Sequence, residues 1–175
     1  MRKSRKKAVA IAKDVIAQIK NLRLMEGTYF QGDVIVPPSV SDAQDLIGPI
    51  TKKCTVCGIG ACFISSIRLF DEMPIRRLRL HRLRPRFSDL PSELLSIDGD
   101  AIRSHLDRFF DGRDLRLIEA AFECSTGLAY RRGYPRIGLK EAERAQEFGE
   151  RFESRRRRLV AIMENVVKHK GRFKV

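Results

Sequence analysis

Apolar residues recur at helical spacing over most of the chain. Between residues 5 and 24 they follow steps of three and four, which predicts an amphipathic helix with a basic first turn. The same spacing predicts a helix from Cys57 to about Phe70 and a long C-terminal helix over residues 140–169, which Gly171 ends. The sequence therefore predicts a mainly α fold.

Capping signals place the shorter helices between these long ones. Ser41 and Gln44 have the spacing of a capping box, and that helix is expected to end by Gly48. Asp98 and Asp111 stand where each can cap a further helix. The count is five or six helices, in a single basic helical domain over residues 1–175.

Two stretches break the helical pattern. Residues 28–37 alternate apolar residues with a Gly-Asp turn and end in proline, which predicts a small β-hairpin. Within the C-terminal helix, residues 154–158 read SRRRR and contain no apolar side chain. The helix is expected to bend or break near 154–158.

The predicted helical domain is strongly basic. The 175 residues carry 24 Arg and 11 Lys against 22 acidic residues, a net charge of +13. The excess lies in residues 1–13, 76–86, 155–158 and 168–174, whereas residues 89–123 are locally acidic. Such polarity favours an acidic partner, either nucleic acid, a nucleoprotein or an acidic host protein.

The candidate partner-binding residues come from three of the chain's segments. Arginines would contact phosphates, and tyrosines in a Gly- and Arg-rich loop could stack on exposed bases or simply pack that loop. These residues are Arg76, Arg77, Arg79, Arg82, Arg84, Tyr130, Arg131, Arg132, Tyr134, Arg155, Arg156, Arg157 and Arg158.

Three other interpretations of the charge stay open. A basic face could dock on an acidic protein through a few arginine anchors. The helices could instead hold an anionic nucleotide signal. A preference for Arg over Lys also follows from a GC-rich genome, although that bias does not explain the net excess.

The segment KKCTVCGIGACFIS holds three of the four cysteines. Cys54 and Cys57 have the spacing of a zinc knuckle, which Cys62, Cys124 or His81 could complete, but a second close ligand pair is missing. Gly58 and Gly60 could open a phosphate loop, yet the remaining glycine and Walker-type residues are missing. Neither a metal nor another cofactor is predicted.

The favoured interpretation of that segment is a core helix. Gly58, Ala61, Cys62 and Ser65 form a face of small side chains on a helix, against which a neighbour could pack closely. A free cysteine behaves there as a small hydrophobe.

Catalysis is not predicted. The three histidines are His81, His105 and His169, and two of them lie beside basic residues that disfavour a general base. Asp98, Asp100, Asp111 and Asp114 stand where helix caps belong. We therefore expect a non-enzymatic binding protein.

The compartment expected is the cytoplasm. Lys13, Asp14 and Gln18 interrupt the first apolar stretch, so it does not resemble a signal peptide. No apolar run approaches the roughly 20 residues needed to cross a bilayer.

Three segments also resemble a family of small uncharacterised phage and prophage proteins: CTVCGIGACFISSIRLFD, LRLIEAAFE and RRLVAIMENVVKHKGRF. The family often shows a Cys before a Gly-Ala step, an Ile-Glu-Ala-Ala-Phe-like helix and an ending before Lys-Gly-x-Phe. The resemblance implies a protein of a mobile element, acting in the host cell, for example by inhibiting a CRISPR complex. It carries no established chemistry, so no catalytic residue follows from it, and Cys57 and Cys62 do not resemble shared ligands.

Overall fold

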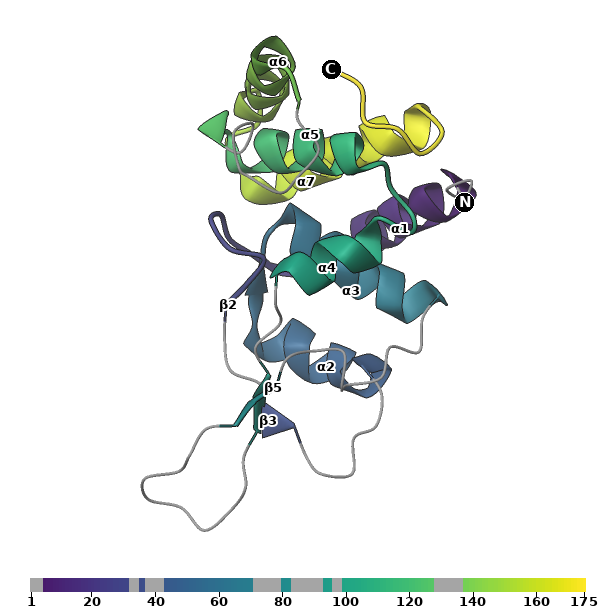
Figure 1. Ribbon diagram of the computed structural model, residues 1–175, viewed down its shortest axis with the longest axis vertical. Coiled ribbons are helices and arrows are strands. Elements are labelled where there is room, and N and C mark those ends of the chain that lie inside the picture. Colours follow the sequence, from purple (N-terminus) through teal and green to yellow (C-terminus); the bar gives the residue numbers. More distant parts are fainter. Residues whose placement is uncertain are drawn as a thin grey trace.

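The computed structural model describes residues 5–31, 35–36, 43–70, 80–82, 93–95, 99–127 and 137–175. Over these ranges the fold is mainly helical, as predicted, with six very short strands and with seven helices instead of the five or six expected (Figure 1). The helices are α1 (Arg5–Gln18), α2 (Ala43–Lys53), α3 (Gly58–Phe70), α4 (Gly99–Leu106), α5 (Gly112–Glu123), α6 (Leu139–Glu150) and α7 (Arg155–Lys168). The strands are β1 (Arg23–Leu24), β2 (Phe30–Gln31), β3 (Ile35–Val36), β4 (Thr55–Val56), β5 (Leu80–Arg82) and β6 (Glu93–Leu95).

Helix α3 forms the centre of the core and is buried on every side from Gly58 to Ile67. It contacts α1, α2, α4 and α5. The face of small side chains allows close packing, as expected. A Cβ on Gly58 would lie 3.0 Å from the Phe122 ring of α5, and Cys62 Sγ lies 3.9 Å from Met163 Sδ of α7. The cysteine segment is therefore a core helix, packed against α5 and α7.

Helices α1 and α7 pack against each other in opposite directions. A Cβ on Gly171, just past the end of α7, would lie 2.6 Å from the carbonyl oxygen of Arg5 at the start of α1. At the other end of the pair, Leu22 and Leu24 line a groove together with Ser154, which precedes α7. The carboxyl end of α1 and the amino end of α7 are therefore neighbours.

The hairpin prediction for residues 28–37 is only half right. Strands β2 and β3 are extended, but they belong to different sheets. Strand β2 pairs antiparallel with β4, which also pairs in parallel with β1, whereas β3 pairs with β6 and β6 with β5. Partners distant in sequence satisfy the backbone groups that a hairpin would have paired locally.

The single long helix expected over 140–169 is two helices. Helix α6 ends at Glu150, and α7 begins at Arg155 after the connection 151–154. Ser154 is extended and its side chain accepts a hydrogen bond from Arg157 N, so it caps α7. The break thus precedes the arginines, which belong to the first turn of the new helix.

The expected end of the second helix at Gly48 is wrong. Helix α2 continues through Gly48 and Pro49 to Lys53. Leu46 and Ile50 are both buried on either side of these two residues. Packing of that apolar face against the core outweighs the hydrogen bond that proline removes.

Two predicted helix boundaries are confirmed. Asp111 caps α5, and its carboxylate accepts from Arg113 N at 3.0 Å. Gly171 follows the end of α7, where Lys170 and Gly171 both adopt positive φ (+54° and +89°), and the Gly171 N–H donates to the carbonyl oxygen of Val166. A left-handed residue after a helix is a common way to satisfy its last carbonyl groups.

Candidate functional site

The arginine run occupies the first turn of α7. No acidic residue stands in that turn, and Arg155, Arg156 and Arg157 are exposed whereas Arg158 is buried. Positive charge at the amino end of a helix opposes the helix dipole. The exposed arginines therefore do not stabilise their own helix, and another role must account for them.

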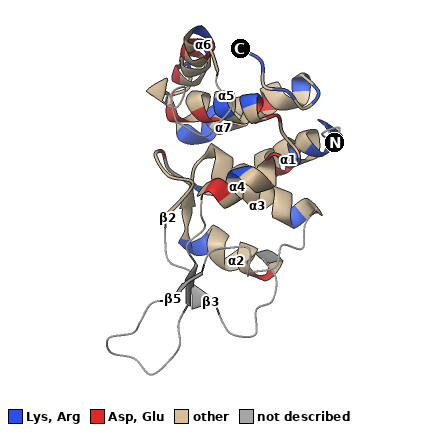
Figure 2. Cartoon of the chain, in the orientation of Figure 1, with Lys and Arg blue, Asp and Glu red and all other residues tan. Residues whose placement is uncertain are grey.

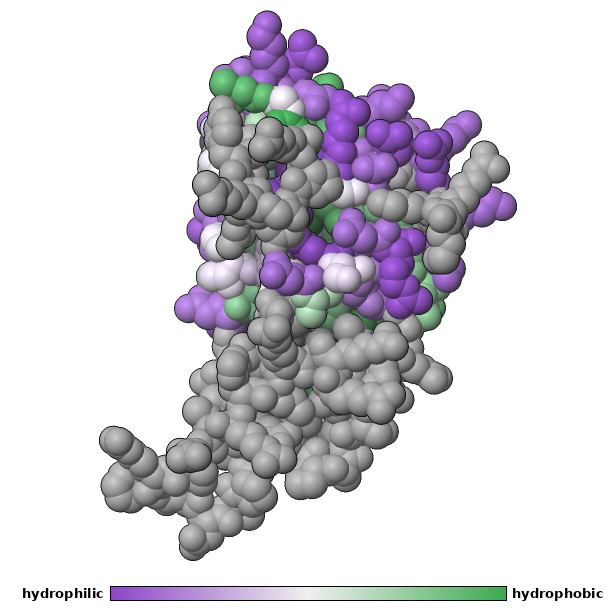
Figure 3. Space-filling model, viewed as in Figure 1, coloured by the Kyte–Doolittle hydropathy of each residue, from purple (hydrophilic) through white to green (hydrophobic). Residues whose placement is uncertain are grey.

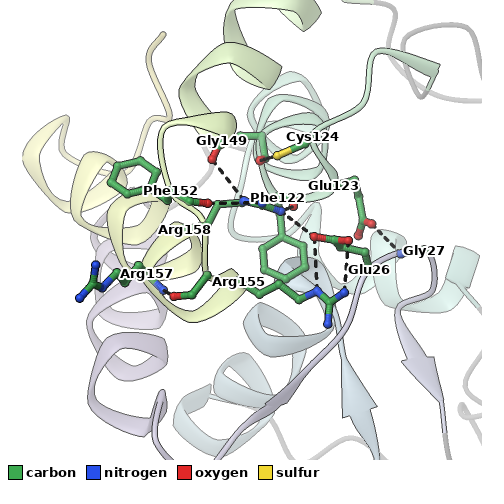
Figure 4. Close-up of polar contacts among 12 residues, drawn as sticks. Glu26, Gly27, Phe122, Glu123, Cys124, Gly149, Phe152, Arg155, Arg157 and Arg158 are labelled. Carbon is green, nitrogen blue, oxygen red and sulfur yellow. Dashed lines mark hydrogen bonds and ion pairs between the residues drawn. The ribbon is translucent and has the colours of Figure 1, made fainter.

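Arg158 does not belong to the exposed set, contrary to the expectation that it contacts a partner. Its guanidinium points into the interior, where it donates to the carbonyl oxygens of Phe122 at 2.7 Å and Gly149 at 3.2 Å (Figure 4). These carbonyls lie in the last turns of α5 and α6, where carbonyl groups have no N–H partner within the helix, and that of Gly149 also accepts from Phe152 N at 3.1 Å. Arg158 therefore joins the carboxyl ends of two helices, where positive charge is favourable.

The partly exposed Glu26 also binds the Arg158 guanidinium. Its carboxylate accepts from Arg158 at 2.7 Å and lies 3.3 Å from Arg155 Nε. Burial raises the pKa of Glu26, but hydrogen bonds and charge from Arg158 and Arg155 together outweigh it, so the pKa is lowered. Arg155 is thus held on one side by Glu26 and remains about half exposed on the other.

Arg156 and Arg157 are the arginines available to a partner. Arg157 points away from the Glu26 cluster in Figure 4. Within the described part of the chain, the side chain of neither arginine forms an ion pair, and Glu150 accepts from Gln146 instead of an arginine. Two guanidinium groups are therefore free to bind an anion.

The segment that follows α1 adds two further basic residues, Lys20 in a turn and Arg23 in β1, which the sequence interpretation did not include. Lys20 and Arg23 are exposed and flank Leu22, which lines the groove next to Arg155 and Arg156. Lys and Arg gather at both ends of α7 in Figure 2, and hydrophilic residues cover much of the described surface in Figure 3. We call Lys20, Arg23, Arg155, Arg156 and Arg157 the basic corner.

The groove has a volume of about 400 Å³. It lies between the segment that follows α1 and the residues that begin α7. Its lining combines apolar, acidic, hydroxyl and basic residues, namely Leu22, Leu24, Glu153, Ser154, Arg155 and Arg156.

Most other predicted partner-binding residues lie outside the described residues. Arg82 is in β5, where only the backbone is described. The predicted residues that lie outside the described ranges are Arg76, Arg77, Arg79, Arg84, Tyr130, Arg131, Arg132 and Tyr134. Their contribution stays a prediction.

Three of the four cysteines lie in the core. Cys54, Cys57 and Cys62 are buried and Cys124 is half-buried, all as free thiols. Burial raises the pKa of both Cys57 and Cys62 to about 12, which disfavours the thiolates that bind zinc. Across the ranges that the structure describes, no three His, Cys, Asp or Glu side chains are arranged to hold a metal ion.

The structure contains a buried polar network that the sequence did not predict. Glu119 on α5 accepts from Tyr29 at 2.9 Å, forms an ion pair with Arg103 of α4 and lies 3.4 Å from Arg116. All three charged side chains are under 5 % exposed. Sequence spacing offered no signal for it, because Arg116 and Glu119 look like an ordinary exposed pair on a helix.

Two histidines have structural partners. His105 is buried, with Nε2 3.0 Å from Ser66 Oγ and its ring edge against Phe63 and Phe109. His169 Nδ1 lies 2.9 Å from the carbonyl oxygen of Asn165 at the end of α7. Of His81, only the backbone in β5 is described.

Neither a protein-family model, a curated protein nor a solved structure matches this chain. The resemblance to phage proteins therefore stays a prediction. Among the helices within the described ranges, none combines the length and the apolar character required to cross a bilayer.

Proposed function

We propose that the protein binds nucleic acid through the basic corner, without catalysing a reaction. The observation that carries the proposal is the exposure of Arg156 and Arg157, two adjacent guanidinium groups that have no acidic partner among the described residues. A guanidinium presents its N–H donors in a planar fork that matches phosphate oxygens.

The surroundings of these two arginines support the proposal. Lys20 and Arg23 add exposed positive charge in the segment that follows α1. Glu26, a nearby carboxylate, is already bound by Arg155 and Arg158 and therefore competes weakly for Arg156 and Arg157. A net charge of +13 adds long-range attraction to any polyanion.

The resemblance to phage proteins would give this binding a target. A basic corner could occupy the nucleic-acid path of a host nucleoprotein, such as a CRISPR complex, and so block a defence system. An acidic host protein would use the same arginines but without phosphate contacts.

The test is the fluorescence anisotropy of a labelled oligonucleotide titrated with the purified protein at increasing salt. Binding that weakens steeply as salt rises is expected, because phosphate contacts release condensed counterions. No binding to single- or double-stranded oligonucleotides at low salt would overturn the proposal. A pull-down from host lysate that survives nuclease treatment would then point to a protein partner.

A further inference from the structure

The groove at the basic corner combines groups that no simple anion requires. Arg155 and Arg156 provide positive charge, and Ser154 provides a hydroxyl. Leu22 and Leu24 add apolar residues from the segment after α1. Glu153, which is exposed, adds a carboxylate to the same lining.

The Glu153 carboxylate restricts which ligands can bind in the groove. A free phosphate would meet Glu153 as well as the arginines, and the two like charges repel each other. A favourable ligand must instead carry an anion for the arginines and a hydrogen-bond donor for Glu153. It can also present an apolar surface to Leu24, which is half-buried, whereas Leu22 is only 4 % exposed.

An unpaired nucleotide has all three features. Its phosphate is the anion, its base has apolar faces, and cytosine carries an amino group at N4 that a glutamate can accept from. The groove, with a volume of about 400 Å³, is open to solvent and can therefore receive one nucleotide of a continuous strand. A base within a duplex could not enter, because its Watson–Crick edge is already paired.

We infer that this groove holds one unpaired nucleotide of a nucleic acid strand, so that the protein binds single strands or unpaired ends and favours cytosine over thymine there. Glu153 selects the base, Arg155 and Arg156 hold the phosphate, and Leu24 contacts the ring. This inference rests on the proposed function but goes further, since binding to phosphates alone would not depend on the base.

The experiment compares two single strands of equal length, oligodeoxycytidine and oligothymidine, with a duplex hairpin that has no unpaired bases. Thymine presents an acceptor, O4, where cytosine presents its amino group. The wild type should bind oligodeoxycytidine at least about fivefold more tightly than oligothymidine. The hairpin should bind more weakly than either strand.

Glu153→Ala and Glu164→Ala form a matched pair. Each removes one exposed negative charge from α7 or its approach, so each should strengthen binding to oligothymidine to a similar degree. Only Glu153→Ala should bring the ratio between the two strands close to one, because Glu164 does not line the groove.

Equal, salt-dependent affinity of the wild type for both strands would overturn the inference and leave the proposed function intact. Retention of the wild-type ratio by Glu153→Ala would likewise overturn the inference alone. Absence of binding to all three nucleic acids would overturn both the inference and the proposed function.

Discussion

The Arg158 guanidinium lies 2.7 Å from the main-chain carbonyl oxygen of Phe122, 36 residues earlier in the chain. Through this contact the last arginine of a charged run closes the end of another helix. Arg156 and Arg157, the two residues before it, are exposed. A run of four identical residues therefore divides into a structural part and a part that is free to bind.

Replacement of Arg158 should destabilise the protein strongly. In Arg158→Met the buried carbonyl group of Phe122 loses its donor, whereas that of Gly149 keeps the N–H of Phe152, and an orphaned buried acceptor costs about 1–3 kcal/mol. Chemical denaturation should show this loss. Arg157→Met is the matched control, and its free energy of unfolding should stay within about 0.5 kcal/mol of wild type. Equal stability of the two variants would contradict the assigned role of Arg158.

Gly149 should tolerate no side chain. A Cβ there would lie 1.8 Å from the carbonyl oxygen of Ala121, because α6 approaches the backbone of α5 directly. Gly149→Ala should lower the free energy of unfolding by about 3 kcal/mol. Gly138→Ala, before the other end of α6, has its nearest neighbour at 3.9 Å and should cost under about 1 kcal/mol. Similar melting temperatures for these variants would show that the close approach is absent.

Acid should remove the contribution of Glu26. Its pKa is lowered in the folded protein, so its stabilising effect is full above the ordinary value of 4.5 and is lost as pH falls through the folded value. Glu26→Gln should be less stable than wild type at neutral pH by about 0.5–1 kcal/mol, a modest amount because Glu26 is partly exposed. The difference should close well below pH 4.5. A gap that is constant with pH would contradict the ion pair.

The cysteines should behave as core thiols. The purified protein is expected to contain no stoichiometric zinc, and EDTA should leave its melting temperature unchanged. A thiol reagent should modify Cys124 first, because Cys54, Cys57 and Cys62 are buried. One zinc per chain, or rapid modification of Cys57 and Cys62 in the folded protein, would contradict this assignment.

Local signals in the sequence were sufficient for part of the fold. The apolar spacing of α3, the cap at Asp111 and the stop at Gly171 depend on neighbouring residues, and all three were predictable. Strand pairing was not, because β2 and β4 are brought together by the helices between and around them. The continuation of α2 past Pro49 likewise depends on tertiary packing.

The candidate site was predictable at its centre but not at its edges. Arg158 carried an unused signal: it stands four residues before Ile162 and eight before Val166, on the buried face of α7. Lys20 and Arg23 are separated from α7 by more than 130 residues, so their place at the basic corner required the fold. The groove could not be predicted from the sequence either, because its lining comes from these two distant segments.

The central claim is that Arg156 and Arg157 bind phosphates, and the salt dependence of Arg156→Glu/Arg157→Glu tests it most directly. Lys140→Glu/Arg144→Glu on α6 makes the same change in net charge at exposed positions away from the basic corner. Both variants should melt close to the wild type. The plot of log binding constant against log salt should become shallower by about 1.5 or more only for the arginine variant, since two phosphate contacts are lost. Equal slopes for the wild type and Arg156→Glu/Arg157→Glu, with comparable affinity, would contradict the account.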